Sequence, residues 1–133
     1  MLSDKTYRLI FWYAMVAVLL LSLLPISAPE LELFHWQDKL HHFITYSALC
    51  FLGIQAYGQN YSVWIIGFVL VVFGLVIEFA QSLTGYRFGD PIDLAANTLG
   101  IIVAGVFLRN QRNKLRFLCI AAVIILKHNY LLI

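Results

Sequence analysis

The sequence predicts an all-α, polytopic membrane protein, a four-helix transmembrane bundle with both ends of the chain in the cytoplasm. Its composition is far more apolar than that of a soluble domain. Of 133 residues, 62% are hydrophobic and 12% are charged, against about 45–50% and about 25% in soluble domains. The apolar residues form blocks long enough to cross a hydrocarbon core of about 30 Å. Most basic residues lie between or beyond these blocks, where they favour one orientation in the membrane.

Four apolar blocks give the predicted transmembrane helices, and residues 1–133 are treated as one membrane domain. The predicted helices cover residues 7–24, 40–57, 63–83 and 91–108. Pro25 ends the first helix, because proline cannot donate the next backbone hydrogen bond. Gly58 and Gly85 mark the turns that precede the third and fourth helices.

The first apolar block has a competing interpretation as a secretory signal peptide. Lys5 and Arg8 precede it, as basic residues do in such peptides. The small residues Ser27 and Ala28 are followed directly by Pro29, which disfavours cleavage there. We therefore expect a membrane helix.

The C-terminal segment is predicted to be a short tail outside the bundle core. Its apolar run, residues 117–126, is too short to cross a membrane alone. We expect residues 117–133 to be interfacial or packed against the bundle. A fifth span that continues to Ile133 is the alternative.

The basic residues predict the orientation. With the N-terminus inside, the cytoplasmic side receives Lys5, Arg8, Arg109, Arg112, Lys114 and Arg116. The outer side receives Lys39 and Arg87. Because basic residues accumulate on the cytoplasmic side, we expect an N-in, C-in protein of the bacterial cytoplasmic membrane. The connections between helices one and two and between helices three and four then both lie outside.

Polar and small residues recur every three or four positions on three helices, so they share one face of each. They are Lys39, His42, Tyr46, Cys50 and Gly53 on helix two, Gly67, Gly74, Glu78 and Gln81 on helix three, and Asp93, Asn97, Gly100 and Ala104 on helix four. The polar members lie at the outer end of each face. Small residues let membrane helices approach closely, so we expect these faces to pack together around an outer polar cluster.

Glu78 is the clearest candidate for a buried charge. A charged residue at the centre of a span costs about 2.5–3.5 kcal/mol on insertion scales, so it faces the bundle or a wet cavity. We expect Arg87, Lys39 or His42 to be its partner. A cluster that only holds the helices together is the alternative interpretation.

The start of the fourth helix has its own signals. Asp90 followed by Pro91 is typical of an N-cap and first helical residue. Asp93 would then lie near the positive end of the helix dipole. Asn97 lies too deep for capping, and we expect it to form a hydrogen bond between helices.

Metal and cofactor binding are not predicted. His35, His41 and His42 with Asp38 supply ligand types that zinc accepts. Their spacing does not match a metal-binding helix motif, and Glu78 with Gln81 lacks the histidine of di-iron bundles. A formal net charge of +2 is too small to indicate nucleic acid as a partner.

The polar residues resemble two signatures of the VanZ-like family of bacterial membrane proteins, named for a protein associated with resistance to the glycopeptide teicoplanin. Ser22 and Pro25 resemble the end of that family's first helix. The signatures comprise Asp38, Lys39, His42, Phe43 and Tyr46, and then Glu78, Gln81, Arg87, Asp90, Asp93, Asn97 and Gly100. The resemblance covers residues 10–108 and implies a role in the cell envelope, including glycopeptide resistance, without specifying a reaction.

The candidate site is an outer polar pocket made of Lys39, His42, Tyr46, Glu78, Gln81, Arg87, Asp93 and Asn97. We expect Lys39 and Arg87 to hold the phosphate or carboxylate of an anionic lipid or cell-wall precursor, close to the N-terminus of helix four. An enzyme with Glu78 or His42 as general base is the first alternative, and a purely structural membrane subunit is the second. A transporter is disfavoured because Glu78 lies near the outer surface and no inverted repeat is present.

Overall fold

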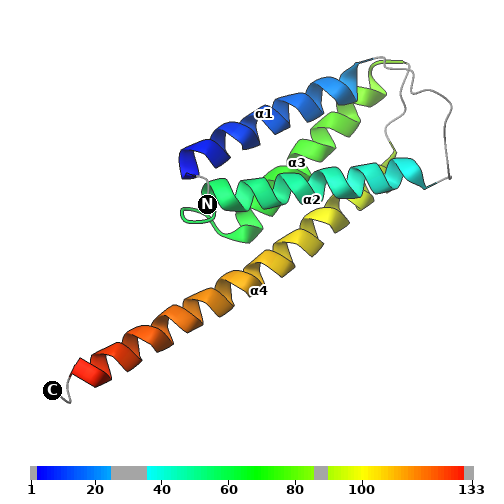
Figure 1. Ribbon diagram of the computed structural model, residues 1–133. Coiled ribbons are helices and arrows are strands. Elements are labelled where there is room, and N and C mark those ends of the chain that lie inside the picture. The colour runs from blue at the N-terminus through cyan, green and yellow to red at the C-terminus, as the bar shows by residue number, and fades with distance from the viewer. Residues whose placement is uncertain (1–2, 25–35, 86–89, 131–133) are drawn as a thin grey trace.

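The computed structural model describes residues 3–24, 36–85 and 90–130, and the side chains as far as 111. Within these residues the chain forms α1 (Asp4–Leu23), α2 (Gln37–Tyr57), α3 (Val63–Ser82) and α4 (Pro91–Tyr130). Successive helices run in opposite directions (Figure 1). The predicted all-α, four-helix architecture is therefore confirmed.

Three stretches of the described residues are long and apolar enough to cross a membrane: α1, α3 and the part of α4 from Pro91 to Gln111. The chain is therefore a multi-pass membrane protein of helices. The predicted fourth span, α2, is not among the three. The reason is its polar first turns, which carry Asp38, Lys39, His41 and His42.

Side-chain caps fix where three of the helices begin. The Ser3 side chain accepts a hydrogen bond from the Thr6 N–H at 3.2 Å, and Ser62 accepts one from the Ile65 N–H at 3.3 Å. Asp90 Oδ1 accepts one from the Ile92 N–H at 2.8 Å. Each cap satisfies a backbone donor that the first turn of a helix leaves free. The prediction that Asp90 caps the fourth helix is confirmed.

The helix packing is centred on α2, which contacts the other three helices and packs most extensively on α4. The buried core of this packing includes Tyr46, Leu49 and Cys50 of α2, Leu70 of α3 and Ile101 of α4. Large apolar side chains on the outward faces, such as Phe68 and Phe107, are exposed in the isolated chain. Those faces are suited to lipid, because lipid tails are the solvent there.

The predicted close approach of small residues is confirmed. A Cβ atom on Gly100 would collide with the backbone carbonyl of Phe43, and the Ser47 hydroxyl donates to the Gly100 carbonyl at 3.1 Å. A Cβ on Gly74 would lie 3.1 Å from the Tyr46 hydroxyl and 3.3 Å from Asn97 Nδ2. Glycine therefore allows α2 and α4 to touch and leaves room for polar groups beside α3.

The predicted fourth span, residues 91–108, agrees with the apolar part of α4, Pro91–Gln111, but the helix does not end there. α4 continues without a break for 40 residues, to Tyr130, and its C-terminal half extends away from the other helices (Figure 1). The apolar block ends near residue 108, but neither proline nor glycine occurs between Val106 and Tyr130 to stop the helix. Residues 117–130 are thus a continuation of α4, with no turn from which a separate fifth span would start.

The two ends of the bundle differ in chemistry. At one end, which we call the basic end, the Arg8 side chain donates to the Ala56 carbonyl at 3.2 Å and lies over the Tyr57 ring. Arg109 lies over the Trp64 ring at the same end. The opposite end, the polar end, carries the first turns of α2 and α4 and the last turn of α3. The predicted separation of Arg8 and Arg109 from the polar cluster is confirmed.

Candidate functional site

Lys39 joins α2 to the beginning of α4 at the polar end. Its Nζ atom lies 2.7 Å from Asp90 Oδ2 and 2.5 Å from Asp93 Oδ1, and 3.9 Å from Asp38 Oδ2. The Lys39 ammonium, with a hydrogen bond from the Ile92 N–H, holds the pKa of the Asp90 carboxyl below its ordinary value. Lys39 thus acts first as the counter-ion of two carboxylates on α4.

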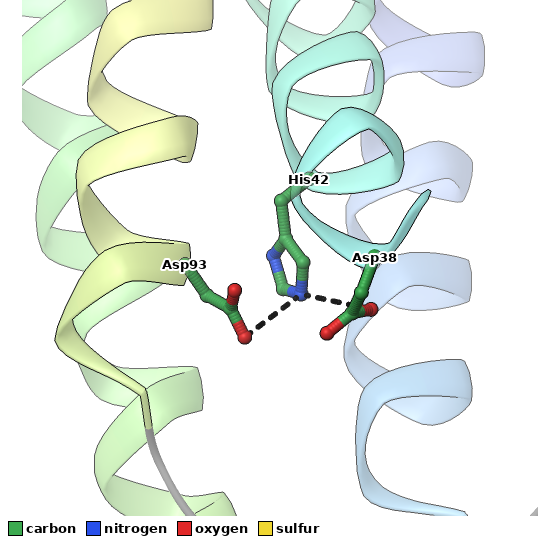
Figure 2. Close-up of side chains that lie close together, drawn as sticks. All are labelled: Asp38, His42 and Asp93. Carbon is green, nitrogen blue, oxygen red and sulfur yellow. Dashed lines mark ion pairs between the residues drawn. The ribbon is translucent and has the colours of Figure 1, made fainter. Parts of the chain in front are cut away.

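His42 lies between two carboxylates and is oriented by a third group. Its Nδ1 atom lies 3.0 Å from Asn97 Oδ1. Because that oxygen can only accept, Nδ1 carries the proton and donates it. Figure 2 shows the other ring nitrogen, Nε2, facing the carboxylates of Asp93 on α4 and Asp38 on α2, at 3.6 Å and 3.9 Å. The prediction that Asn97 bonds between helices is confirmed.

Glu78 is buried inside the bundle, as predicted, with 8% of its surface exposed. Its Oε2 atom accepts a hydrogen bond from the Asp90 N–H at 3.1 Å, and the carboxyl group interacts electrostatically with His42. Its Oε1 atom has no hydrogen-bond partner among the described residues. Of the three expected partners, His42 is thus near Glu78, Lys39 pairs with other carboxylates, and Arg87 lies outside the described residues.

Tyr46 and Gln81 extend the cluster in two directions. The Tyr46 hydroxyl is buried over Gly74 and has no hydrogen-bond partner among the described residues. Gln81 donates from Nε2 to the Ser22 carbonyl at 3.0 Å, which ties the ends of α1 and α3 together. The α1 contact was not predicted, because a backbone acceptor leaves no signal in the sequence.

The structure brings together six of the eight predicted site residues: Lys39, His42, Tyr46, Glu78, Asp93 and Asn97. Gln81 lies nearby and is turned toward α1. Asp38 and Asp90 join the cluster, although neither was among the predicted site residues. Asp90 was expected to be a helix cap and a member of the second family signature. Asp38 precedes His42 by one helical turn, a spacing that does place two side chains on one face.

A polar cavity of about 170 Å³ lies beside the cluster, between α1 and α2. Its polar lining consists of Ser22, Asp38, His41, His42, Thr45 and Tyr46. Val18 and Leu21 of α1 close its apolar side. The cavity therefore offers hydrogen-bonding groups at one wall and aliphatic surface at the other, which is a lining suited to a molecule with a polar head and an apolar chain.

No family model, curated protein or solved structure matches the chain. The resemblance to the VanZ-like family therefore stays a prediction.

Proposed function

We propose that the chain is a VanZ-like module of the bacterial cell envelope, in the cytoplasmic membrane, whose outer cavity holds the head group of an anionic lipid or cell-wall precursor. The cavity between α1 and α2 carries the proposal. It lies next to the cluster, and it is lined by residues of α1 and α2. A lipid would enter from the side, with its head group at the polar wall and its chain along Val18 and Leu21.

The proposed topology has four spans, with α2 as the fourth. α2 has 21 residues, enough to cross the hydrocarbon core. Its exposed large apolar side chains, Leu40, Ile44 and Phe51, lie on one side of the helix, and Tyr46 and Cys50 are buried against its neighbours. The low hydropathy of α2 thus comes from its first turns at the polar end, where Lys39 and His42 are half-buried and Asp38 and His41 are exposed.

Basic residues support the N-in, C-in orientation. Arg8 and Arg109 lie at the same end of the bundle, beside the connection between α2 and α3. Basic residues accumulate on the cytoplasmic side of membrane proteins. The polar end, with the cavity, would then face outward, where lipid head groups of the outer leaflet and cell-wall precursors are found.

Lys39 takes a different part in this proposal from the one expected from sequence. Held between Asp90 and Asp93, it fixes α2 against α4 and keeps the cavity wall in place. Contacts to the head group would come from His41, Thr45 and Ser22 of the cavity lining, together with Arg87. The role in glycopeptide resistance that the family resemblance implies is part of the same proposal, since such resistance acts at the outer face of the membrane.

The test fills the cavity and asks whether lipid is lost. Thr45→Leu adds apolar volume at the cavity wall. Thr98→Leu is the matched control, because Thr98 is also half-buried, donates to the Leu94 carbonyl of its own helix, and is not among the cavity-lining residues. Each purified protein is examined by native mass spectrometry with phosphatidylglycerol and with phosphatidylethanolamine of the same acyl chains.

The expected result is retention of phosphatidylglycerol over phosphatidylethanolamine by the parent protein and Thr98→Leu, and loss of that preference, by about tenfold or more, in Thr45→Leu. Equal retention of the two lipids by the parent protein would contradict anion recognition. An unchanged preference in Thr45→Leu would place the lipid elsewhere on the protein.

A further inference from the structure

Three side chains at the polar end, those of Asp38, His42 and Asp93, have two polar atoms each. In each side chain one polar atom contacts Asn97 or Lys39, and the other faces the remaining two side chains. His42 donates from Nδ1 to Asn97 Oδ1 and presents Nε2. Asp93 engages Lys39 through Oδ1 and presents Oδ2. Asp38 lies nearest Lys39 through Oδ2 and presents Oδ1. Figure 2 shows the three side chains converging from α2 and α4.

The distances between the presented atoms are too long for hydrogen bonds. Nε2 of His42 lies 3.6 Å from Asp93 Oδ2 and 3.9 Å from Asp38 Oδ1, whereas N–H···O bonds span about 2.7–3.2 Å. Two ligands of one zinc ion, each at about 2.0–2.2 Å in tetrahedral geometry, lie about 3.3–3.6 Å apart. One ligand atom from each of these three residues falls within 4.8 Å of the others. The His42–Asp93 separation thus matches that of two zinc ligands, and Asp38 Oδ1, at 3.9 Å from Nε2, would have to move a few tenths of an ångström closer to bind the same ion.

The tautomer of His42 points the same way. Because Nδ1 donates to Asn97 Oδ1, Nε2 is the ring nitrogen left to bind an ion, and it faces two carboxylates. A histidine whose second nitrogen donates to an amide oxygen is the usual arrangement at a protein metal site.

We propose that Asp38, His42 and Asp93 bind a divalent first-row transition-metal ion, with zinc as the expected ion, through Asp38 Oδ1, His42 Nε2 and Asp93 Oδ2. Asn97 and Lys39 are the positioning residues, because each holds the far atom of a ligand. The proposal stands independently of lipid binding in the cavity.

Charge and ligand type both fit such an ion. The carboxylates of Asp38, Asp90 and Asp93 surround one ammonium group, that of Lys39, which leaves two negative charges for a divalent cation to balance. An imidazole nitrogen favours zinc and its neighbours over magnesium, which prefers six oxygen ligands. Asp93 is 7% exposed, so water can do little to balance the charge of its carboxylate.

Three protein ligands leave a fourth position open, as in catalytic rather than structural zinc sites. Asp38 and His42 also line the cavity between α1 and α2. A water molecule or an oxygen atom of a molecule in the cavity would complete the coordination. The ion would then place a positive charge at the cavity wall. The ammonium group of Lys39 does not provide that charge, because it is paired with Asp90 and Asp93.

The test measures zinc binding to the full chain in detergent. The protein is purified through a tag without histidine, stripped with a chelator, and titrated calorimetrically with Zn²⁺ and, separately, with Mg²⁺. Asp38→Asn removes a ligand whose side chain is 68% exposed, so the fold should survive. Asp4→Asn is the matched control, because both acids occupy the first turn of a helix and Asp4 lies at the start of α1, where the basic end is.

The expected result is saturable binding of one Zn²⁺ per chain, no comparable Mg²⁺ binding, a loss of zinc affinity by more than about tenfold in Asp38→Asn, and no change in Asp4→Asn. Zinc affinities within twofold for the parent protein and Asp38→Asn, or no saturable zinc binding by the parent, would overturn the proposal. Should Asp38→Asn lose its helical circular dichroism, Asp93→Asn is scored by the same criterion.

Discussion

At the scale of single residues, Asn97 determines the chemistry of its neighbour. Its side chain is 1% exposed, and its Oδ1 atom accepts the Nδ1 proton of His42. Because a buried amide is costly unless it is hydrogen-bonded, the position of Asn97 is fixed by the contact it makes. The orientation of the His42 ring, and with it the direction of Nε2, follows from a residue on a different helix.

Glu78 affects the bundle through one backbone donor. Its Oε2 atom accepts the hydrogen bond of the Asp90 N–H, which lies directly before the first turn of α4. Glu78→Gln keeps an oxygen that can accept this bond, whereas Glu78→Ala leaves the N–H unpaired in a partly buried site. We expect Glu78→Ala to lower the free energy of unfolding by about 1–3 kcal/mol, and Glu78→Gln to lower it by less.

Thermal unfolding of both variants in the same detergent gives the comparison, with the helical circular dichroism of each folded state as the control. Equal loss of stability in the two variants would show that the charge of Glu78, rather than its acceptor oxygen, is what the fold requires.

At the scale of helices, the contact between α2 and α4 depends on Gly100. A Cβ atom there would meet the Phe43 carbonyl and the Ser47 hydroxyl, and backbone cannot move aside without separating the helices. We expect Gly100→Ala to destabilise the bundle by about 1–3 kcal/mol, the usual cost of overpacking.

Gly105→Ala on the same helix is the control for this prediction. A Cβ there would lie 3.1 Å from Val63 Cγ1, a side-chain contact that a shift of a few tenths of an ångström relieves, and alanine favours the helix over glycine by about 1 kcal/mol. Thermal unfolding should therefore show a loss for Gly100→Ala and little change or a gain for Gly105→Ala. A similar loss at both positions would mean that α4 tolerates no side chain on this face.

The helices and their facing surfaces were predictable because they depend on periodicity. Residues three or four positions apart share a helical face, so the positions of Tyr46, Gly74 and Gly100 in the sequence predicted which faces of α2, α3 and α4 pack together. The polar end followed from Lys39, Glu78 and Asp93, which occupy equivalent places on three helices.

The features that were not predicted depend on side-chain distances or on where a helix ends. The sequence offers several carboxylates as partners for Lys39, and only the geometry shows that it pairs with Asp90 and Asp93. The position of Asp38 Oδ1 opposite His42 Nε2 is likewise a matter of side-chain conformation. The length of α4 was missed because hydropathy reports where the chain leaves lipid, whereas a helix ends only where a residue breaks it.

At the scale of the whole molecule, α4 makes the protein asymmetric. Its 40 residues correspond to about 60 Å at 1.5 Å per residue, roughly twice the thickness of the hydrocarbon core. The part beyond the bundle leaves from the basic end (Figure 1). With the basic end in the cytoplasm, α4 would project into the cell while the polar end and its cavity face outward.

The four-span topology makes the last prediction, and α2 is the helix that decides it. In a variant without Cys50 and Cys119, single cysteines replace Trp36 before α2, Asn60 after α2 and Leu83 after α3. Trp36 and Leu83 are exposed at the polar end, and Asn60 is exposed in the connection between α2 and α3.

A membrane-impermeant maleimide applied to intact spheroplasts should label the cysteines at 36 and 83, and label the cysteine at 60 only after lysis. The physical reason is that the charged residues of α2, Asp38 and Lys39, lie in its first turn, so they can stay at the membrane surface while the apolar remainder of the helix crosses the hydrocarbon core. Labelling at 36 and 60 from the same side would show that α2 does not cross.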